Sequence, residues 1–240
     1  MNPEIFGWQH LVYLAVCLII SIASLVCIKI FVKDEKKQDI IVRCIGGLLL
    51  AMIVWNRIAI AISNKNGWNL IPDSFCGMSS LVLALSCILG KRNNAVLHFV
   101  VYLALLGDIL TVFYPDFIGQ NPSFFYPNTI SGLLHHTIGL VLCILLFMTG
   151  WFKPDWHKWP NLIVGFLAYI TLGAFLISVL GYDNAFYINS PMLSGTPLTV
   201  WVLAPIFAIL YVVFMVCYYL ISNKLSQKKK SKTEEKEKQA

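Results

Sequence analysis

Charged residues are scarce in this chain: Asp, Glu, Lys and Arg together make up 12% of its 240 residues, whereas soluble domains carry roughly 25%. Hydrophobic residues make up 58%, and the mean hydropathy is +0.73. A soluble fold could not cover so much apolar surface, so most side chains must face lipid or one another. No linker divides the chain, and we expect one all-α membrane domain.

Several motifs are also missing, and each absence excludes a class of protein. The seven cysteines show no paired short spacings, which excludes a disulfide framework or a zinc site. No His-x-x-x-His motif occurs, which argues against seven-helix zinc hydrolases, and the last apolar segment has no lysine for a retinal Schiff base. The N-terminus lacks the basic region of a signal peptide. We expect no cleavable signal, no metal and no cofactor.

Apolar runs of about 20 residues, the length that crosses a bilayer as a helix, occur seven times. They lie at Trp8–Phe31, Ile40–Ile62, Pro72–Gly90, Ala95–Tyr114, Thr129–Trp151, Trp159–Leu180 and Leu198–Ile221. These runs predict a bundle of seven transmembrane helices over residues 1–223. The remaining residues, 224–240, lack apolar periodicity and are expected to form a disordered tail.

The basic residues of the connections are distributed very unevenly. The connections after the first, third and fifth segments carry Lys33, Lys36, Lys37, Lys91, Arg92, Lys153 and Lys158. The tail adds Lys224, Lys228, Lys229, Lys230, Lys232, Lys236 and Lys238. The opposite side has only Lys65. The positive-inside rule therefore predicts a multi-pass protein of the cell membrane with its N-terminus outside and its C-terminus inside. The tail is expected to contact anionic lipid headgroups, and nucleic acid is not an expected partner.

This orientation brings the polar residues of the apolar segments to one depth, in the outer half of the bilayer. They are His10, Asn56, Arg57, Asp73, Cys76, Asp108, His135 and His136, and Asn184 follows on the same side. Polar groups at such depth usually mark a pocket or a partner. The connections 114–129 and 182–197, rich in Asn, Pro and aromatic residues, are expected to be ordered lids over that pocket.

Arg57 needs a carboxylate at this depth, and Asp108 or Asp73 could supply it. Such a pair could merely fix helix packing, or Arg57 could bind an anionic headgroup. His135 and His136 are consecutive and diverge by about 100° on a helix, so we expect only one to face the site. His136 belongs to a stripe with Gly132, Gly139 and Cys143 and is the one we expect inside.

Cys76 lies in the first turn of the third segment, behind Pro72, which suits a first helical position. A helix N-terminus favours the thiolate form of a cysteine. With a histidine as base, Cys76 would form a nucleophilic pair. The alternative is a buried, inert cysteine.

Four stretches carry a family resemblance: IPDSFCGMSSLVLAL, GDILTVFYP, SGLLHHTIGL and GYDNAFYINSP. Their order and spacing resemble the YwaF and transmembrane protein 164 family, which is distantly similar to androgen-induced membrane hydrolases. The first family motif is close to Leu-Pro-Leu-His-Leu-Cys, and here Asp73 and Ser74 replace its Leu and His. The resemblance implies a lipid acyltransferase with Cys76 as nucleophile and His135 or His136 as base.

Two functions therefore stand at this point. The first is a Cys/His lipid acyltransferase or lipid-ester hydrolase acting on a membrane lipid. The second is a transporter or binding protein for a small solute or lipid, in which Arg57, Asp108 and His136 bind without covalent chemistry. Uptake or binding that tolerates loss of Cys76 would favour the second.

Overall fold

The computed structural model describes residues 3–192 and 195–239, with side chains described as far as Lys224. These residues form seven α-helices: α1 (Trp8–Phe31), α2 (Glu35–Ser63), α3 (Phe75–Leu89), α4 (Leu97–Phe113), α5 (Pro127–Met148), α6 (Pro160–Ser178) and α7 (Val200–Gln239). Three short 3₁₀-helices, Gly67–Leu70, Ile118–Gln120 and Trp156–Lys158, lie in the connections. The predicted all-α fold with seven helices is confirmed.

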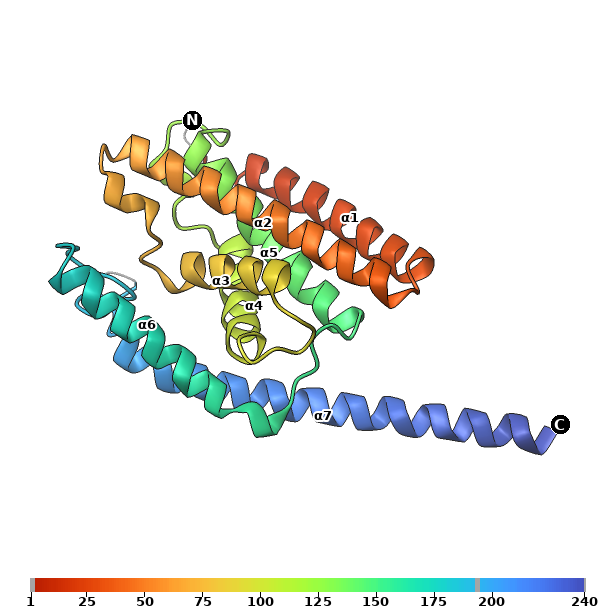
Figure 1. Ribbon diagram of the computed structural model, residues 1–240. Coiled ribbons are helices and arrows are strands. Elements are labelled where there is room, and N and C mark those ends of the chain that lie inside the picture. The colour runs from red at the N-terminus through yellow and green to blue at the C-terminus, as the bar shows by residue number, and fades with distance from the viewer. Residues whose placement is uncertain (1–2, 193–194, 240) are drawn as a thin grey trace.

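Four helices, α2 to α5, form the centre of the bundle (Figure 1). Helix α2 packs against α3 and α5, and α4 packs against the same two helices. Helix α1 lies on α5, while α6 and α7 cover the other side, where Phe166 of α6 contacts Phe207 of α7 with ring centroids 5.2 Å apart. Most of α4 is buried, whereas the outer helices expose apolar side chains such as Ile19 and Leu220.

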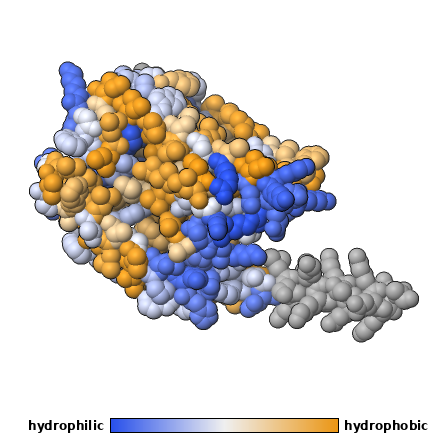
Figure 2. Space-filling view, in the orientation of Figure 1, coloured by the Kyte–Doolittle hydropathy of each residue, from blue (hydrophilic) through white to orange (hydrophobic). Residues whose placement is uncertain are grey.

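Five of these helices are long and apolar enough to cross a membrane: α1, α2, α5, the stretch Trp156–Ser178 and the first 25 residues of α7, Val200–Lys224. Helices α3 and α4 have 15 and 17 residues, fewer than the usual length of a span, and are also apolar. Apolar side chains cover much of the face seen in Figure 2. The chain is a multi-pass membrane protein.

The start of α3 differs from its expected position. The helix begins at Phe75 rather than at Pro72, because the hydroxyl of Ser74 accepts a hydrogen bond from the Gly77 N–H and caps the helix. Cys76 is therefore the second helical residue. At the other end of the chain, the backbone of α7 is helical to Gln239. The side chains of the expected lysine tail lie outside the described residues beyond Lys224, so its contact with headgroups stays a prediction.

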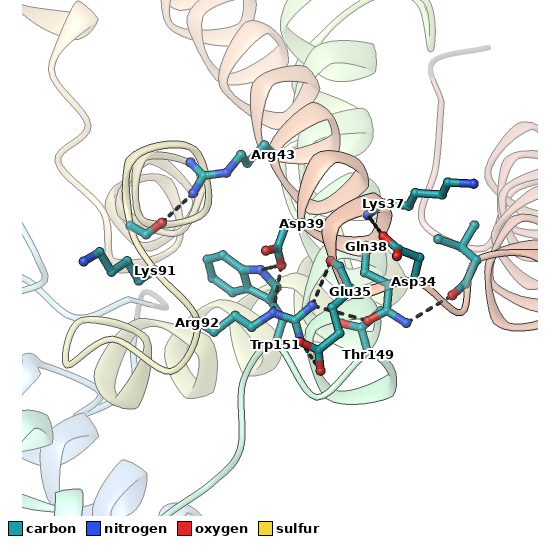
Figure 3. Close-up of polar contacts among 12 residues, drawn as sticks. Asp34, Glu35, Lys37, Gln38, Asp39, Arg43, Lys91, Arg92, Thr149 and Trp151 are labelled. Atoms are coloured by element: carbon teal, nitrogen blue, oxygen red, sulfur yellow. Dashed lines mark hydrogen bonds and ion pairs between the residues drawn. The ribbon is translucent and has the colours of Figure 1, made fainter.

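The α1–α2, α3–α4 and α5–α6 connections meet at one end of the bundle, and Asp39 in the first turns of α2 ties them together (Figure 3). Its carboxylate accepts hydrogen bonds from Arg92 Nε and Trp151 Nε1, both at 2.8 Å. Arg92 also donates to the Glu35 carbonyl and the Gln38 side chain. We call Asp39, Arg92 and Trp151 the Asp39 clamp. A large hydrophilic area covers this end in Figure 2.

Candidate functional site

A polar cavity of about 420 Å³ lies among α2, α3, α4 and α5. Five of the residues predicted from the sequence line it: Asn56, Arg57, Cys76, His135 and His136. They come from three helices, so the cavity exists only in the folded bundle. Sequence analysis missed other polar residues of its wall, including Thr111, Asp116 and Asn128. Thr111 and Asn128 could have been found from their places in the GDILTVFYP stretch and at the start of α5.

The two connections expected near the pocket both contribute to the wall of this cavity. Phe117, Gln120 and Asn121 of the α4–α5 connection line it, as do Tyr187 and Met192 of the α6–α7 connection. This part of the prediction is confirmed.

Strained backbone places Tyr187 on the cavity wall. Phe186 and Tyr187 have φ angles of 49° and 59°, in the left-handed region that side-chain-bearing residues rarely adopt. Phe186 is fully buried, with its ring 5.4 Å from that of Phe75, and its N–H donates to the Asp73 carbonyl. These contacts hold the strained turn in place. Burial raises the pKa of the Tyr187 phenol, so it stays a neutral hydrogen-bond donor.

His136 and Asp108 form a buried pair between α5 and α4. The ring nitrogen Nδ1 of His136 lies 2.7 Å from Oδ1 of Asp108, so the Nδ1–H donates to the carboxylate and Nε2 is left for an occupant of the cavity. Asp108 is fully buried, and its other oxygen, Oδ2, has no partner. A carboxylate that fixes the tautomer of a histidine is the arrangement found in nucleophilic triads.

His135 also faces the cavity, so the expectation that only one histidine would do so is wrong. The two ring centroids are 3.9 Å apart, and the ring planes are tilted by 37°. Nδ1 of His135 donates to the Ser131 carbonyl at 3.2 Å, and its buried Nε2 has no partner. Two imidazoles therefore contribute to one site.

The thiol of Cys76 packs against α4. A Cβ atom built on Gly107 would lie 2.8 Å from the sulfur, so only glycine leaves room for it there. Thr111 of α4 lines the polar cavity together with Cys76. Among the described residues, no hydrogen bond joins the thiol to His135 or His136. The cysteine and the two histidines line the same cavity.

Arg57 pairs with Asp73 and not with Asp108. Its guanidinium lies 3.7 Å from the Asp73 carboxylate and donates to the side-chain oxygen of Asn56. The amide nitrogen of Asn56 in turn donates to the Asn128 carbonyl and the Ser131 hydroxyl. The cluster of Arg57, Asp108 and His136 proposed for a binding protein is therefore divided between two separate pairs.

Three of the predicted pocket residues have other surroundings. His10 is fully buried: its Nε2 donates to the Val112 carbonyl at 3.0 Å, and its Nδ1 accepts from the Phe6 N–H. Asn184 accepts from the N–H groups of Asn189 and Ser190 and so shapes its own connection. Asp73 is connected to the site by its ion pair with Arg57. None of the three is among the residues that line the cavity.

The fold and the cavity define a multi-pass, all-α membrane protein with a polar cavity under two ordered connections. The chain matches the TMEM164 family over residues 5–222, and it belongs to that family. No curated protein and no solved structure matches it. The matched range contains all the residues discussed for the cavity.

Proposed function

We propose that this protein is a lipid acyltransferase or lipid-ester hydrolase in which Cys76 is the nucleophile. One observation carries the proposal: Cys76 and a histidine already oriented by a buried carboxylate line the same cavity. His136 would be the general base, with Asp108 as its positioning residue. His135, whose ring centroid lies 3.9 Å from that of His136, would exchange a proton with the same occupant.

The chemistry balances without a cofactor. Nε2 of His136 takes the thiol proton, directly or through one water, and the sulfur attacks the carbonyl carbon of a lipid ester. The tetrahedral intermediate collapses, the acyl C–O bond breaks, and the leaving alkoxide takes the proton back from His136. Water or a lysolipid hydroxyl then attacks the thioester and releases the acyl group as an acid or a new ester.

The cavity wall suits a polar lipid headgroup. Arg57 lines the cavity, and so do Asn64 and Asn121, which carry amide side chains. Guanidinium groups bind phosphate through paired hydrogen bonds. A glycerophospholipid, or its lysolipid as acceptor, is therefore the proposed substrate.

We further propose that the N-terminus faces outward across the cell membrane, so that the cavity opens to the outside. The basic connections and the Asp39 clamp lie at the opposite end of the bundle, as the positive-inside rule requires of the inner side. Reporter fusions active on only one side of the membrane test this. An N-terminal fusion should report outside and a C-terminal fusion inside; the reverse pattern would overturn the orientation.

Cys76→Ala and Cys76→Ser are the direct tests of the chemistry. The full-length protein in vesicles would receive a phospholipid with a labelled acyl chain, and transfer to lysolipid or water would be followed. We expect both variants to lose about a thousandfold of the turnover or more. The wild type should also carry a labelled thioester that hydroxylamine releases.

The matched control is Cys27→Ala, which alters an exposed cysteine outside the cavity. It should retain full turnover. If Cys76→Ala retains it as well, the nucleophile assignment fails. Uptake or binding that needs Arg57 and Asp108 but tolerates Cys76→Ala would favour the transporter or binding protein instead.

A further inference from the structure

A second hollow, this one apolar, begins where the polar cavity ends. It has a volume of about 110 Å³ and lies between α4 and the outer helices α6 and α7. Its walls are formed by Leu103 and Leu106 of α4, Phe166 of α6, and Ile206 and Leu210 of α7. Cys76, Tyr187 and Met192 line both this hollow and the polar cavity. Cys76 therefore stands at the boundary between a polar and an apolar compartment.

A third hollow, of about 250 Å³, continues along the same seam between α4 and α7. It shares Leu106, Phe207 and Leu210 with the second hollow and reaches Tyr102, Tyr211 and Phe214. We call the second and third hollows together the α4–α7 groove. The groove is open sideways, because Ile206 and Leu210 are 41% and 42% exposed on the surface that would face lipid.

We infer that the α4–α7 groove binds the acyl chain of the lipid ester, with the ester carbonyl at Cys76 and the headgroup in the polar cavity. This inference rests on the proposed function and adds the acyl-chain site and its entrance. A molecule that fills both compartments must be polar at one end and apolar at the other, with its junction at the thiol. In a lipid ester that junction is the bond to be cleaved.

The shape of the groove also sets a preference for chain length. From Leu203 to Phe214 its α7 wall spans eleven helical steps, or about 16 Å at 1.5 Å per residue. An extended chain of roughly a dozen carbons is needed to cover that length. Long-chain esters bury their whole chain against the wall, whereas short-chain esters leave most of it uncovered and lose the free energy of that burial.

Leu106→Trp and Leu210→Trp test the groove, because both residues line both of its hollows. The control is Ile209→Trp, next to Leu210 but 64% exposed and absent from the groove wall. Vesicles would contain palmitoyl and octanoyl phospholipids in equal amounts. We expect each groove variant to lower the ratio of palmitoyl to octanoyl turnover about tenfold, with Ile209→Trp unchanged. Cys76-dependent turnover with an unchanged ratio in both groove variants would overturn the inference.

A second readout does not require turnover. A photoactivatable palmitoyl phospholipid would be crosslinked to the Cys76→Ser variant and the labelled peptides identified. We expect labels on α4 and α7 around Leu106 and Leu210, and loss of these labels when Leu106→Trp and Leu210→Trp together fill the groove. Labels confined to α1 or to the outward faces of α6 would overturn the inference that the groove binds the acyl chain. Absence of turnover with labelling of the groove would instead overturn the proposed chemistry, so the two failures are distinguishable.

Discussion

The Asp39 clamp and the polar cavity both gather polar side chains from several helices, but they use them differently. In the clamp, Asp39 accepts from Arg92 and Trp151, and Arg92 finds further acceptors on α2. At the cavity and in the His136–Asp108 pair beside it, buried atoms lack partners: Oδ2 of Asp108, Nε2 of His135 and Oδ1 of Asn128. Buried polar groups are normally hydrogen-bonded, and each exception requires an explanation.

The difference separates a structural network from a site. A saturated network fixes the geometry of the connections and has nothing left for a ligand. An unsaturated one around a hollow keeps hydrogen-bonding capacity that a substrate or water can use. The comparison predicts that substitutions at the cavity reduce turnover more than stability, and that those at the clamp do the reverse.

Asp108→Asn should produce the largest effect. The amide is isosteric with the carboxylate but cannot stabilise a charged His136, and it can turn its NH₂ toward Nδ1 and favour the wrong tautomer. We expect kcat for acyl transfer to fall by about 10²- to 10⁴-fold while KM stays within twofold, because Asp108 does not line the cavity. Kinetics on labelled phospholipid vesicles would measure both.

Separate values of kcat and KM distinguish a role of Asp108 in positioning His136 from a role in packing α4 against α5. If Asp108 only held α4 against α5, Asp108→Asn would lower the melting temperature and the fraction of folded protein, and the remaining folded molecules would turn over normally. A normal kcat per folded molecule would contradict the role of Asp108 in positioning His136.

Gly139→Ala should have an intermediate effect on both properties. A Cβ atom at this position would lie 2.3 Å from Oδ2 of Asp108, so the carboxylate must shift and its 2.7 Å hydrogen bond with His136 is disturbed. We expect overpacking to cost about 1–3 kcal/mol of unfolding free energy, with turnover reduced about tenfold.

Gly47→Ala is the control, because nothing lies within 4 Å of a Cβ there. It should slightly stabilise α2, since alanine favours the helix over glycine by roughly 0.5–1 kcal/mol. Equal loss of turnover in both variants would contradict this account.

Most of the fold could be predicted from the sequence because hydropathy and helix length are local properties. The predicted segments agree with the helices within a few residues, apart from the early start of α2, the late start of α3 and the end of α7, which continues to Gln239 beyond the predicted Ile221. The stripe of Gly132, His136 and Gly139 also correctly indicated a helix contact, since Gly139 lies against Asp108. The start of α3 was misjudged because Pro72 and Ser74 both suit a helix N-terminus, and the side-chain cap of Ser74 decided between them.

The site was predicted less completely because its geometry depends on how helices rotate about their axes. Depth along the helices predicted one level for Arg57, Cys76 and the histidines, and these residues line one cavity. Depth could not assign partners, which is why Asp108 was a candidate for Arg57 although it faces His136. His10 shares the same depth but points to the Val112 carbonyl. Pairing is a tertiary property that the pattern of one chain does not contain.

Asp39→Asn should have the smallest effect, and it should lower stability rather than turnover. The substitution removes the charge that Arg92 contacts but keeps an acceptor for Trp151, and the pair is partly exposed, with Asp39 39% and Arg92 26% accessible. Partly exposed ion pairs contribute little, so we expect a loss of about 1 kcal/mol in unfolding free energy. Turnover per folded molecule should not change, because the clamp lies at the other end of the bundle.

Glu35→Gln is the control within the same network, since Glu35 is 82% exposed and 4.0 Å from Arg92, and it should leave both quantities unchanged. A fall in turnover for Asp39→Asn at unchanged stability would mean that the clamp communicates with the cavity, and the division between a structural region and a functional one would then be wrong.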